Sequence, residues 1–399
     1  MREQARQKFR STGRRRGARR RTVRAAAALS VGIVALGALG QSASAAARPD
    51  SAPRTGSVHR TDSVQRGLDS LVRQDGVPAA LASVGDSRGH TRTYTAGVAD
   101  LATGAKVPDD GQVRIGSNTK TFTAVVVLQL VDEGKVRLDA PIEDYLPGLV
   151  RGDGIDGHRI TVRQLLQHTS GLPNYVKYLD AEPRSYTPRE LLDRALQHKK
   201  DFDPGDKWEY SNTNYVLAGM LIEKVTKHRV AHEIERRVIE PLGLRHTYFP
   251  APGETKIREA HPKGYDKDAS GAPLDVTEFD PSWGWSAGQM VSTDSDLNRF
   301  ATAILDGGLL SERRLAEMRT TVPAEYFGRG ARYGLGLVSK PLSCGGVYWG
   351  HGGSMTGYET RGGATDDGRA ANVAVTTQPS DEKVMKHVDR LVDKALCRS

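Results

Sequence analysis

The chain contains very little cysteine: Cys344 and Cys397 are its only two among 399 residues. No cluster of cysteine, histidine and acidic residues has the spacing of metal ligands, so we expect no metal site. If the chain is exported, two cysteines favour one disulfide, and two free thiols are the alternative. The two positions are 53 residues apart. Closing a loop of that length would stabilise the fold by about 4 kcal/mol on the loop-entropy estimate.

The chain also has almost no net charge once its first 45 residues are set aside. It carries 57 Lys and Arg against 48 Asp and Glu, a formal charge of +9. Residues 1–45 hold eleven of the basic residues and one of the acidic ones, which leaves 46 basic and 47 acidic residues. The basicity is therefore a property of the N-terminus, and it gives no case for nucleic-acid binding.

No apolar run reaches the length of a typical membrane span. The strongest run, Ala25 to Gly40, has 16 residues; it follows two arginine triplets and precedes small residues at 42–47. This order is typical of a secretory signal, with cleavage after Ala45 or Ala47. We therefore expect a signal peptide at 1–45 and a secreted bacterial protein with no stable membrane span; a membrane anchor is the alternative. The arginines fit either the general or the twin-arginine export route.

The rest of the chain is predicted to be a short leader and one large domain. Residues 46–61 are rich in proline, serine and glycine, as in a flexible leader, and residues 62–399 show no internal repeat. Hydrophobic periodicity predicts helices at 62–74, 117–133, 162–168, 212–227, 230–240, 293–305 and 380–396, and one more that begins at Thr187. Alternating apolar residues and turn residues predict strands at 79–85, 91–96, 333–338, 347–350, 358–364 and 372–378. We infer a sheet domain with a helical subdomain inserted at about 137–281. Strands at both ends of the chain predict that the termini meet in one sheet.

Ser117 and Lys120 lie three residues apart at the start of an apolar run that extends to Val131. On a helix they would share one face of the first turn. A serine hydroxyl needs a base to act as a nucleophile, and lysine can be that base where burial or a nearby charge lowers its pKa. The pair therefore predicts an activated serine. A chance pair is the alternative, since Ser380 and Lys383 form a second one.

Two further motifs could complete such a site, Tyr210-Ser211-Asn212 before a helix and His351-Gly352-Gly353 after a strand. A tyrosine near an ammonium can lose its proton more easily and relay one, and an asparagine can hold a substrate amide through its donor and its acceptor. His351 could orient the tyrosine or deliver a proton, and the glycines allow close approach of a ligand. Each motif alone is more often structural.

Ser286 is a second candidate for the nucleophile. Gly284-Trp285-Ser286-Ala287-Gly288 matches the nucleophile elbow of α/β-hydrolases, and the residues 351–354 are similar to the oxyanion motif of some of their esterases. That motif should precede the elbow, and here it follows. Residues 279–282 also lack the pattern of the buried strand that an elbow requires. We therefore expect Ser286 not to be the nucleophile.

Taken in order, the motifs around Ser117, Tyr210 and His351 resemble those of the penicillin-recognising serine hydrolases. The similarity runs from about residue 63 to residue 397 and includes the run Tyr333-Gly334-Leu335-Gly336-Leu337 and both cysteines. Within this family the chain most resembles the soluble exported D-alanyl-D-alanine carboxypeptidase/transpeptidases of actinomycetes. It is also related to class C β-lactamases and their esterase relatives.

The resemblance implies an α/β (α+β) fold, in which an antiparallel sheet has helices on both faces and the site lies between the sheet and the helical subdomain. It implies no cofactor. For catalysis, the resemblance implies Ser117 as the acyl-enzyme nucleophile, Lys120 as the candidate base, and Tyr210 with His351 as the proton relay. The backbone N–H groups of Ser117 and Ser354 would form the oxyanion hole. Asn212 would hold the substrate amide, and Trp283, Gly352 and Gly353 would line the cleft. The partners would be a peptide or small acyl substrate, such as a peptidoglycan stem peptide, and β-lactams as inhibitors or substrates of a monomer.

The chain departs from its relatives at two positions. At the positions of Val338 and Gly352, close carboxypeptidases carry an arginine and a threonine that help to hold the terminal carboxylate of the substrate. Lys340 or Arg361 could take over this role here. Class C β-lactamases usually have Lys-Thr-Gly at positions 351–353.

Our leading hypothesis is an exported D,D-peptidase that penicillins acylate. A β-lactamase-fold esterase, amidase, D-aminopeptidase or class C-like β-lactamase is the second, and a non-catalytic peptidoglycan- or penicillin-binding module is the third.

Overall fold

The computed structural model describes residues 62–180, 184–377 and 382–397. The predicted signal peptide and leader, residues 1–61, lie outside this range, and so does Ser380 of the second Ser-x-x-Lys pair. Within the described residues, every helix is too short or too polar to cross a bilayer.

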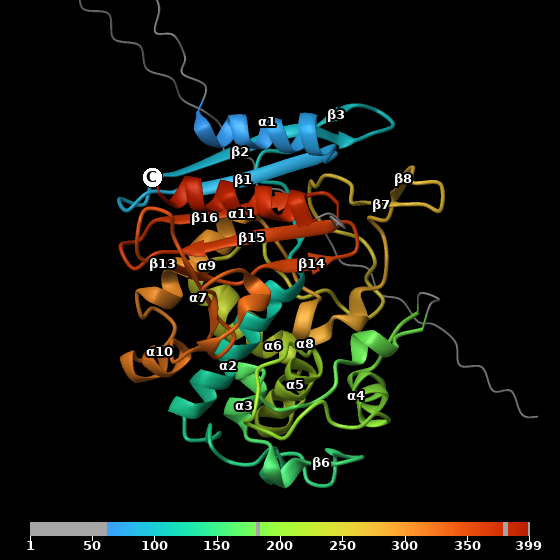
Figure 1. Ribbon diagram of the computed structural model, residues 1–399, viewed down its shortest axis with the longest axis vertical. Helices are drawn as coiled ribbons and strands as arrows, with labels where there is room; N and C mark the ends of the chain where they lie inside the picture. The colour runs from blue at the N-terminus through green and yellow to red at the C-terminus, as the bar shows by residue number, and fades with distance from the viewer. Residues whose placement is uncertain (1–61, 181–183, 378–381, 398–399) are drawn as a thin grey trace, which may run out of the picture. The chain divides into compact units, whose positions relative to one another are not determined.

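Ten strands of the described chain form one antiparallel sheet (Figure 1). They are β1 (Ala79–Gly85), β2 (Thr91–Asp100), β3 (Ala105–Lys106), β10 (Val322–Pro323), β11 (Arg332–Tyr333), β12 (Val338–Pro341), β13 (Val347–Gly350), β14 (Gly353–Met355), β15 (Tyr358–Ala364) and β16 (Ala370–Val375). Their order is β10-β11-β12-β13-β15-β16-β1-β2-β3, with β14 on β15. Ala80 of β1 lies opposite Val375 of β16, which confirms that the two ends of the chain meet in one sheet.

The helices cover both faces of this sheet and form a second layer beside it. They are α1 (Ser63–Asp75), α2 (Thr119–Asp132), α3 (Val162–Gln167), α4 (Pro188–Leu196), α5 (Thr213–Thr226), α6 (Val230–Ile234), α7 (Glu240–Leu242), α8 (Trp285–Gly288), α9 (Asp294–Leu305), α10 (Glu312–Met318) and α11 (Glu382–Leu396). Helices α1 and α11 pack on one face of the sheet and α9 packs on the other (Figure 1). The predicted mixed fold, an antiparallel sheet between helices, is confirmed.

Residues 137–281 contribute α3 to α7 and only small two-stranded pieces, β5 (Arg151–Gly152) with β6 (Ile155–Asp156) and β7 (Tyr265–Lys267) with β8 (Pro273–Asp275). Short strands β4 (Val113–Arg114) and β9 (Val291–Ser292) pair just outside this range. Helices α3 and α4 begin with capping boxes, in which Gln164 and Glu190 are the partners of Thr161 and Thr187. These caps satisfy N–H groups that the first turn of each helix leaves free, so both helices begin where the sequence indicates.

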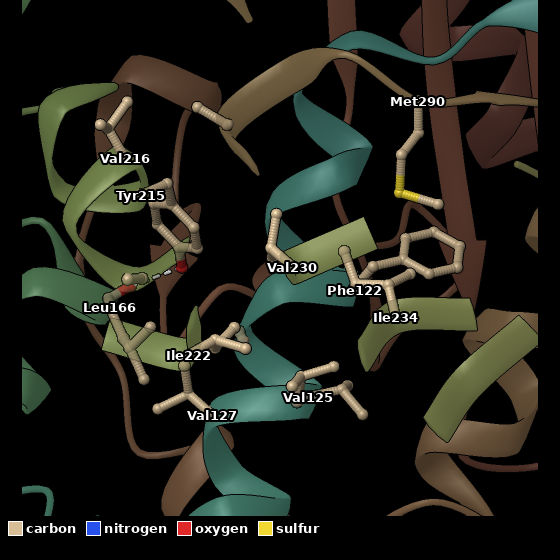
Figure 2. Close-up of a cluster of buried hydrophobic side chains, with 14 of the residues drawn as sticks. Phe122, Val125, Val127, Leu166, Tyr215, Val216, Ile222, Val230, Ile234 and Met290 are labelled. Carbon is tan, nitrogen blue, oxygen red and sulfur yellow. Dashed lines mark hydrogen bonds between the residues drawn. The ribbon is translucent and has the colours of Figure 1, made fainter. Parts of the chain in front are cut away.

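Helix α2 lies at the centre of the domain. Eleven of its fourteen residues are buried, and Phe122 stacks on Phe300 of α9 with ring centroids 3.7 Å apart. Figure 2 shows Phe122 beside Ile234 and Met290, and Val127 beside Ile222 of α5. A helix that is apolar on all sides is stable only in an interior. The turn that carries Ser117 therefore leads into one of the most rigidly packed elements of the molecule.

Two predicted elements were wrong in detail. The strand predicted at 333–338 is a hairpin: Tyr333 of β11 pairs with Val338 of β12, and the residues between them turn. Gly336 makes the turn with a φ of 78°, and a Cβ on it would lie 2.4 Å from Ala124 of α2. The alternation of apolar residues was real, but glycine allowed the chain to reverse. The helix predicted at 230–240 contains a π-helical turn, Glu235–Ile239, before Pro241, which has no N–H to donate.

The predicted disulfide between Cys344 and Cys397 is present, and it joins the turn after β12 to the end of α11. The buried face predicted for this last helix, which includes Val384, Val388 and Leu391, packs with β1 and β16. The bond therefore closes the C-terminal helix onto the sheet that it covers.

We expect a Cys344→Ser/Cys397→Ser double variant to lose up to about 4 kcal/mol of unfolding free energy, because its unfolded chain is no longer restricted by the 53-residue loop. Urea unfolding followed by tryptophan fluorescence measures this loss. Wild-type protein in reductant is the matched control and should show the same midpoint as the variant. An unchanged midpoint in both would contradict a stabilising role for the bond.

Candidate active site

Ser117, Lys120 and Tyr210 meet in one hydrogen-bonded group. Ser117 lies in a 3₁₀ turn, Gly116–Asn118, that continues directly into α2. Its Oγ is 2.9 Å from Lys120 Nζ and 2.8 Å from the hydroxyl of Tyr210, which lies shortly before α5. Residues from two distant parts of the sequence thus contact the same oxygen, at distances suitable for moving a proton.

The amine of Lys120 is completely buried and has no acidic partner. Besides Ser117, its Nζ contacts the side-chain oxygen of Asn212 and the backbone oxygen of Ala287, both at 2.7 Å. Burial lowers the pKa of Lys120 well below its usual value. A neutral amine donates its two N–H groups to these two oxygens, and its lone pair then faces the Ser117 hydroxyl. This is the arrangement that a general base for Ser117 requires.

Tyr210 differs from the expectation. We expected a nearby ammonium to ease the loss of its proton, but burial raises the pKa of Tyr210 well above its usual value. The neutral Lys120 provides no positive charge to offset that burial, although its Nζ lies 4.8 Å from the centre of the Tyr210 ring. Tyr210 is therefore a neutral phenol that donates its hydrogen bond to Ser117 Oγ. In this state it can give a proton to a departing group.

His351 lies beside this group without a hydrogen bond to Tyr210 among the described contacts; their ring centroids are 6.3 Å apart. Its Nδ1 contacts the carbonyl of Gly352, which can only accept, so the ring proton is on Nδ1 and Nε2 accepts from the Tyr333 hydroxyl at 3.1 Å. Burial lowers the pKa of His351 to about 3. The ring is neutral and both its nitrogens are occupied by structural partners.

The backbone of the Ser117 turn lies directly against strand β14. A Cβ on Gly116, whose φ is 47°, would lie 2.6 Å from the backbone oxygen of Ser354, and a Cβ on Gly353 would lie 2.8 Å from the backbone nitrogen of Ser117. The side chain of Asn118 also ties the turn to Thr360 of β15, at 2.7 Å. The backbones of Ser117 and Ser354 are thus neighbours beside the nucleophile, as a two-donor oxyanion site requires.

A cleft of about 670 Å³ opens over Ser117. At one end it is lined by Asn174, Asn212 and Trp283. The side-chain oxygen of Asn212 accepts from Lys120, and its nitrogen donates to the side chain of Asn174 at 3.2 Å. It positions the base as well as lining the cleft. The opposite end of the cleft, on the side of Tyr210 and His351, is lined by Tyr326, Phe327, Val338, Lys340 and Arg361, together with Gly352 and Gly353.

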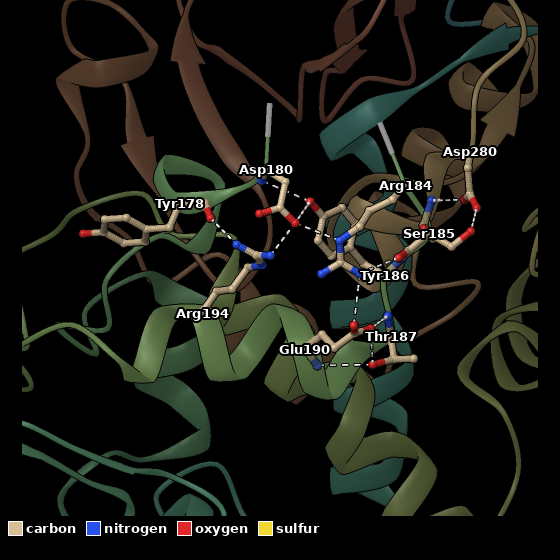
Figure 3. Close-up of polar contacts among 10 residues, drawn as sticks. Tyr178, Asp180, Arg184, Ser185, Tyr186, Thr187, Glu190, Arg194 and Asp280 are labelled. Carbon is tan, nitrogen blue, oxygen red and sulfur yellow. Dashed lines mark hydrogen bonds and ion pairs between the residues drawn. The ribbon is translucent and has the colours of Figure 1, made fainter. Parts of the chain in front are cut away.

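The position of Trp283 is fixed from the helical subdomain. Figure 3 shows Ser185 beside Asp280, to which its hydroxyl donates, and the Thr187–Glu190 capping box below it in this view. The backbone of Tyr186 donates to Ser282 at 2.9 Å, next to Trp283. The start of α4 therefore holds the turn that forms this wall of the cleft.

His168 was not singled out in the sequence analysis. It is completely buried, and its ring centroid is 4.5 Å from that of Tyr210. Its Nδ1 accepts from the backbone of Ser211 at 3.3 Å and faces the side-chain nitrogen of Asn214 at 3.0 Å. Burial lowers its pKa well below the usual value, so it is a neutral support for the Tyr210 segment. No sequence signal reveals this role, because it depends on the packing of α3 against α5.

Ser286 is not available as a nucleophile. Its side chain is completely buried, and its Oγ donates to the backbone oxygen of Tyr215 at 2.8 Å. The preceding residues 279–283 form no strand. Within the described residues, no group of three or more His, Cys, Asp or Glu side chains is placed to hold a metal ion.

Comparison with protein families gives a match to the model described as Beta-lactamase, over residues 64–396. Among curated proteins, penicillin-binding protein 4 of Amycolatopsis lactamdurans is 31% identical over 249 residues, which are 61% of this chain and 64% of that protein. Protein flp of Staphylococcus aureus (strain MW2) is 27% identical over 250 residues, 60% of this chain and 49% of that protein. The chain thus spans about half of the second relative and under two thirds of the first.

Two solved structures are similar over nearly their whole length. The D-stereospecific amidohydrolase from a Streptomyces species is 40% identical, with a TM-score of 0.74, over 82% of this chain and 97% of that one. The D-amino acid amidase from Ochrobactrum anthropi SV3, complexed with L-phenylalanine amide, is 30% identical, with a TM-score of 0.76, over 84% of this chain and 96% of that one.

The two serines give a matched test of the nucleophile. We expect Ser117→Ala to lower the rate of acyl transfer by about 10⁴-fold or more. Ser286→Ala should keep the rate while losing about 1 kcal/mol of stability with its buried hydrogen bond. The measurements are hydrolysis of an activated ester and intact mass after an acylating inhibitor. Acylation that persists in Ser117→Ala would contradict Ser117 as the nucleophile. So would loss of acylation in a folded Ser286→Ala protein.

The buried amine also predicts the pH dependence. Protonation of Lys120 removes the lone pair that accepts the Ser117 proton, so kcat/KM should fall as the pH decreases through the lowered pKa of Lys120. Because that pKa is lowered, full activity should be reached well below about 10.4, the usual value for lysine. A His351→Gln variant should keep this acidic limb, since the pKa of His351 is about 3. Loss of the limb in that variant would show that His351 is the titrating group.

Proposed function

This chain belongs to the Beta-lactamase family, and on that premise we propose that it hydrolyses the amide bond that follows a D-amino acid residue. At the coarser level, it is a serine hydrolase of the β-lactamase fold, related to penicillin-binding proteins and to D-amino acid amidases. The contact of Ser117 Oγ with both Lys120 and Tyr210 is the observation that carries the proposed chemistry. A non-catalytic binding module has no need of such an arrangement.

In the proposed acylation, Ser117 Oγ attacks the substrate carbonyl while Lys120 Nζ takes the hydroxyl proton. The N–H groups of Ser117 and Ser354 stabilise the oxyanion, and each such donor contributes about 3 kcal/mol to the transition state. Tyr210 gives its proton to the leaving nitrogen, the C–N bond breaks, and the amine departs. The tyrosinate then regains a proton from the Lys120 ammonium, so both groups return to their neutral state. Water hydrolyses the acyl-enzyme by the same proton transfers in reverse order.

The substrate class rests on two supports. The first is the 40% identity with a solved D-stereospecific amidohydrolase over 97% of that chain. The second is the wall of the cleft at Val338, which is apolar and 3% exposed where close carboxypeptidases carry an arginine. A terminal carboxylate would find no cation at that position. A D-aminoacyl amide has no such carboxylate, so valine in place of arginine at position 338 is compatible with an amide as the substrate.

Our second candidate is the D-alanyl-D-alanine carboxypeptidase that led the sequence analysis, with penicillins as acylating inhibitors. The support for it is the 31% identity with a penicillin-binding protein and the presence of Arg361 and Lys340 in the cleft. We also propose that residues 1–45 export the protein, since either candidate would then meet D-amino acid peptides of the cell wall outside the cell.

We expect D-phenylalanine amide to be hydrolysed with a kcat/KM at least about tenfold above that of L-phenylalanine amide. Ser117→Ala is the control for contaminating activity. In parallel, intact mass after benzylpenicillin tests the second candidate. A long-lived adduct at Ser117, with release of D-alanine from an acylated D-alanyl-D-alanine and no amidase activity, would replace the first candidate by the second. Absence of all three activities would refute both.

A further inference from the structure

Part of the lining of the cleft lies beside Tyr210, whose ring centroid is 5.6 Å from that of Tyr326. Tyr326, Phe327 and Val338 line this part of it together with Arg361 and Lys340. The leaving ammonia of a primary amide would not fill such a space. The cleft therefore has room for a second residue of the substrate.

An aromatic wall forms one side of this space. Tyr326 is 72% exposed, which makes it one of the few large apolar side chains on the described surface. Its ring lies nearly parallel to that of Tyr210, at 15° and with centroids 5.6 Å apart. Phe327 stands against Tyr326 at 5.1 Å and against His351 at 5.5 Å. An exposed aromatic ring that packs against a second, half-buried ring in the lining of a cleft is typical of a surface that binds an apolar group.

A cation lies in the same part of the cleft. Arg361 packs against Gly352, where a Cβ would lie 2.6 Å from Nη1, so the glycine makes room for the guanidinium. Nη1 donates to the backbone of Thr360 at 2.8 Å and pairs with Glu359. Nε lies 3.9 Å from Asp389, which Lys340 also binds, at 2.8 Å. Among the described contacts, the N–H groups of Nη2 have no hydrogen bond, and a planar guanidinium can donate them to a carboxylate.

We propose that this end of the cleft is a subsite for the leaving residue: an amino acid whose apolar side chain lies on Tyr326 and Phe327 and whose carboxylate is bound by Arg361. This inference rests on the proposed function, in which Tyr210 protonates the leaving nitrogen. The leaving group must then depart on the side of Tyr210, which is the side of the aromatic wall. The enzyme is accordingly a D-aminopeptidase that prefers dipeptides to primary amides.

Substrates that share one acyl group isolate this subsite. D-Alaninamide, D-alanylglycine and D-alanyl-D-phenylalanine all form the same D-alanyl-enzyme, so differences in kcat/KM between them arise from the leaving group. We expect D-alanyl-D-phenylalanine to exceed D-alanylglycine by about tenfold or more. Tyr326→Ala should remove most of this preference, and the matched Tyr326→Phe variant should keep it, because the wall needs the ring and not the hydroxyl.

Arg361→Gln tests the second contact. It should lower kcat/KM for D-alanyl-D-phenylalanine about tenfold more than for the same dipeptide with a C-terminal carboxamide, which has no charge to bind. If Tyr326→Ala instead lowers kcat/KM for all substrates by one factor, the ring only supports Tyr210 and the subsite is refuted.

Different results would contradict the subsite and the proposed function. Hydrolysis of D-alaninamide with no preference among leaving groups would overturn the subsite and leave the proposed function standing. No hydrolysis of any of the three substrates would overturn both.

Discussion

The structure of the site depends on a lysine amine that is buried without a counter-charge. An ammonium in the interior needs compensating charge or hydration to be stable, and the partners of Lys120 among the described residues are a hydroxyl, a side-chain amide oxygen and a backbone carbonyl. Its neutral form is therefore the stable one. Three parts of the fold supply this environment, since Ser117 lies in the turn before α2, Asn212 is the N-cap of α5 and Ala287 lies in α8. The helices around the site thus hold the base in the only protonation state in which it can act.

The same burial keeps the neighbouring groups neutral. It raises the pKa of Tyr210 and lowers the pKa values of His168 and His351. Each histidine has a defined hydrogen-bonding pattern, so both act as fixed supports around Tyr210 and Tyr333. A site of neutral groups begins its reaction without separated charge. In the mechanism that we propose, charge first develops on the oxyanion and on the lysine, where the adjoining backbone N–H groups and carbonyl oxygens can stabilise it.

The two ends of the cleft differ in kind. The end at Asn174, Asn212 and Trp283 presents amide groups and one ring that are held in place by the helical subdomain. The other end presents the exposed ring of Tyr326, the half-buried ring of Phe327 and an arginine whose guanidinium packs against Gly352. Positions 338 and 352, which looked like losses when compared with carboxypeptidases, belong to an apolar wall and to the space for Arg361. In the subsite that we propose, both departures lie on the leaving-group side of the cleft.

The sequence by itself determined the elements whose signals are local. The capping residues Thr161 and Thr187, the buried face of the last helix and the pair Ser117 and Lys120 depend on neighbours within a few positions, so periodicity and motif spacing predict them. Local signals misled where glycine reversed the chain, at Gly336. Only the tertiary structure decided the protonation state of Tyr210, the partners of His351 and the place of His168 and Arg361. Those properties follow from burial and from contacts between segments far apart in the chain, and no short stretch of sequence contains that information.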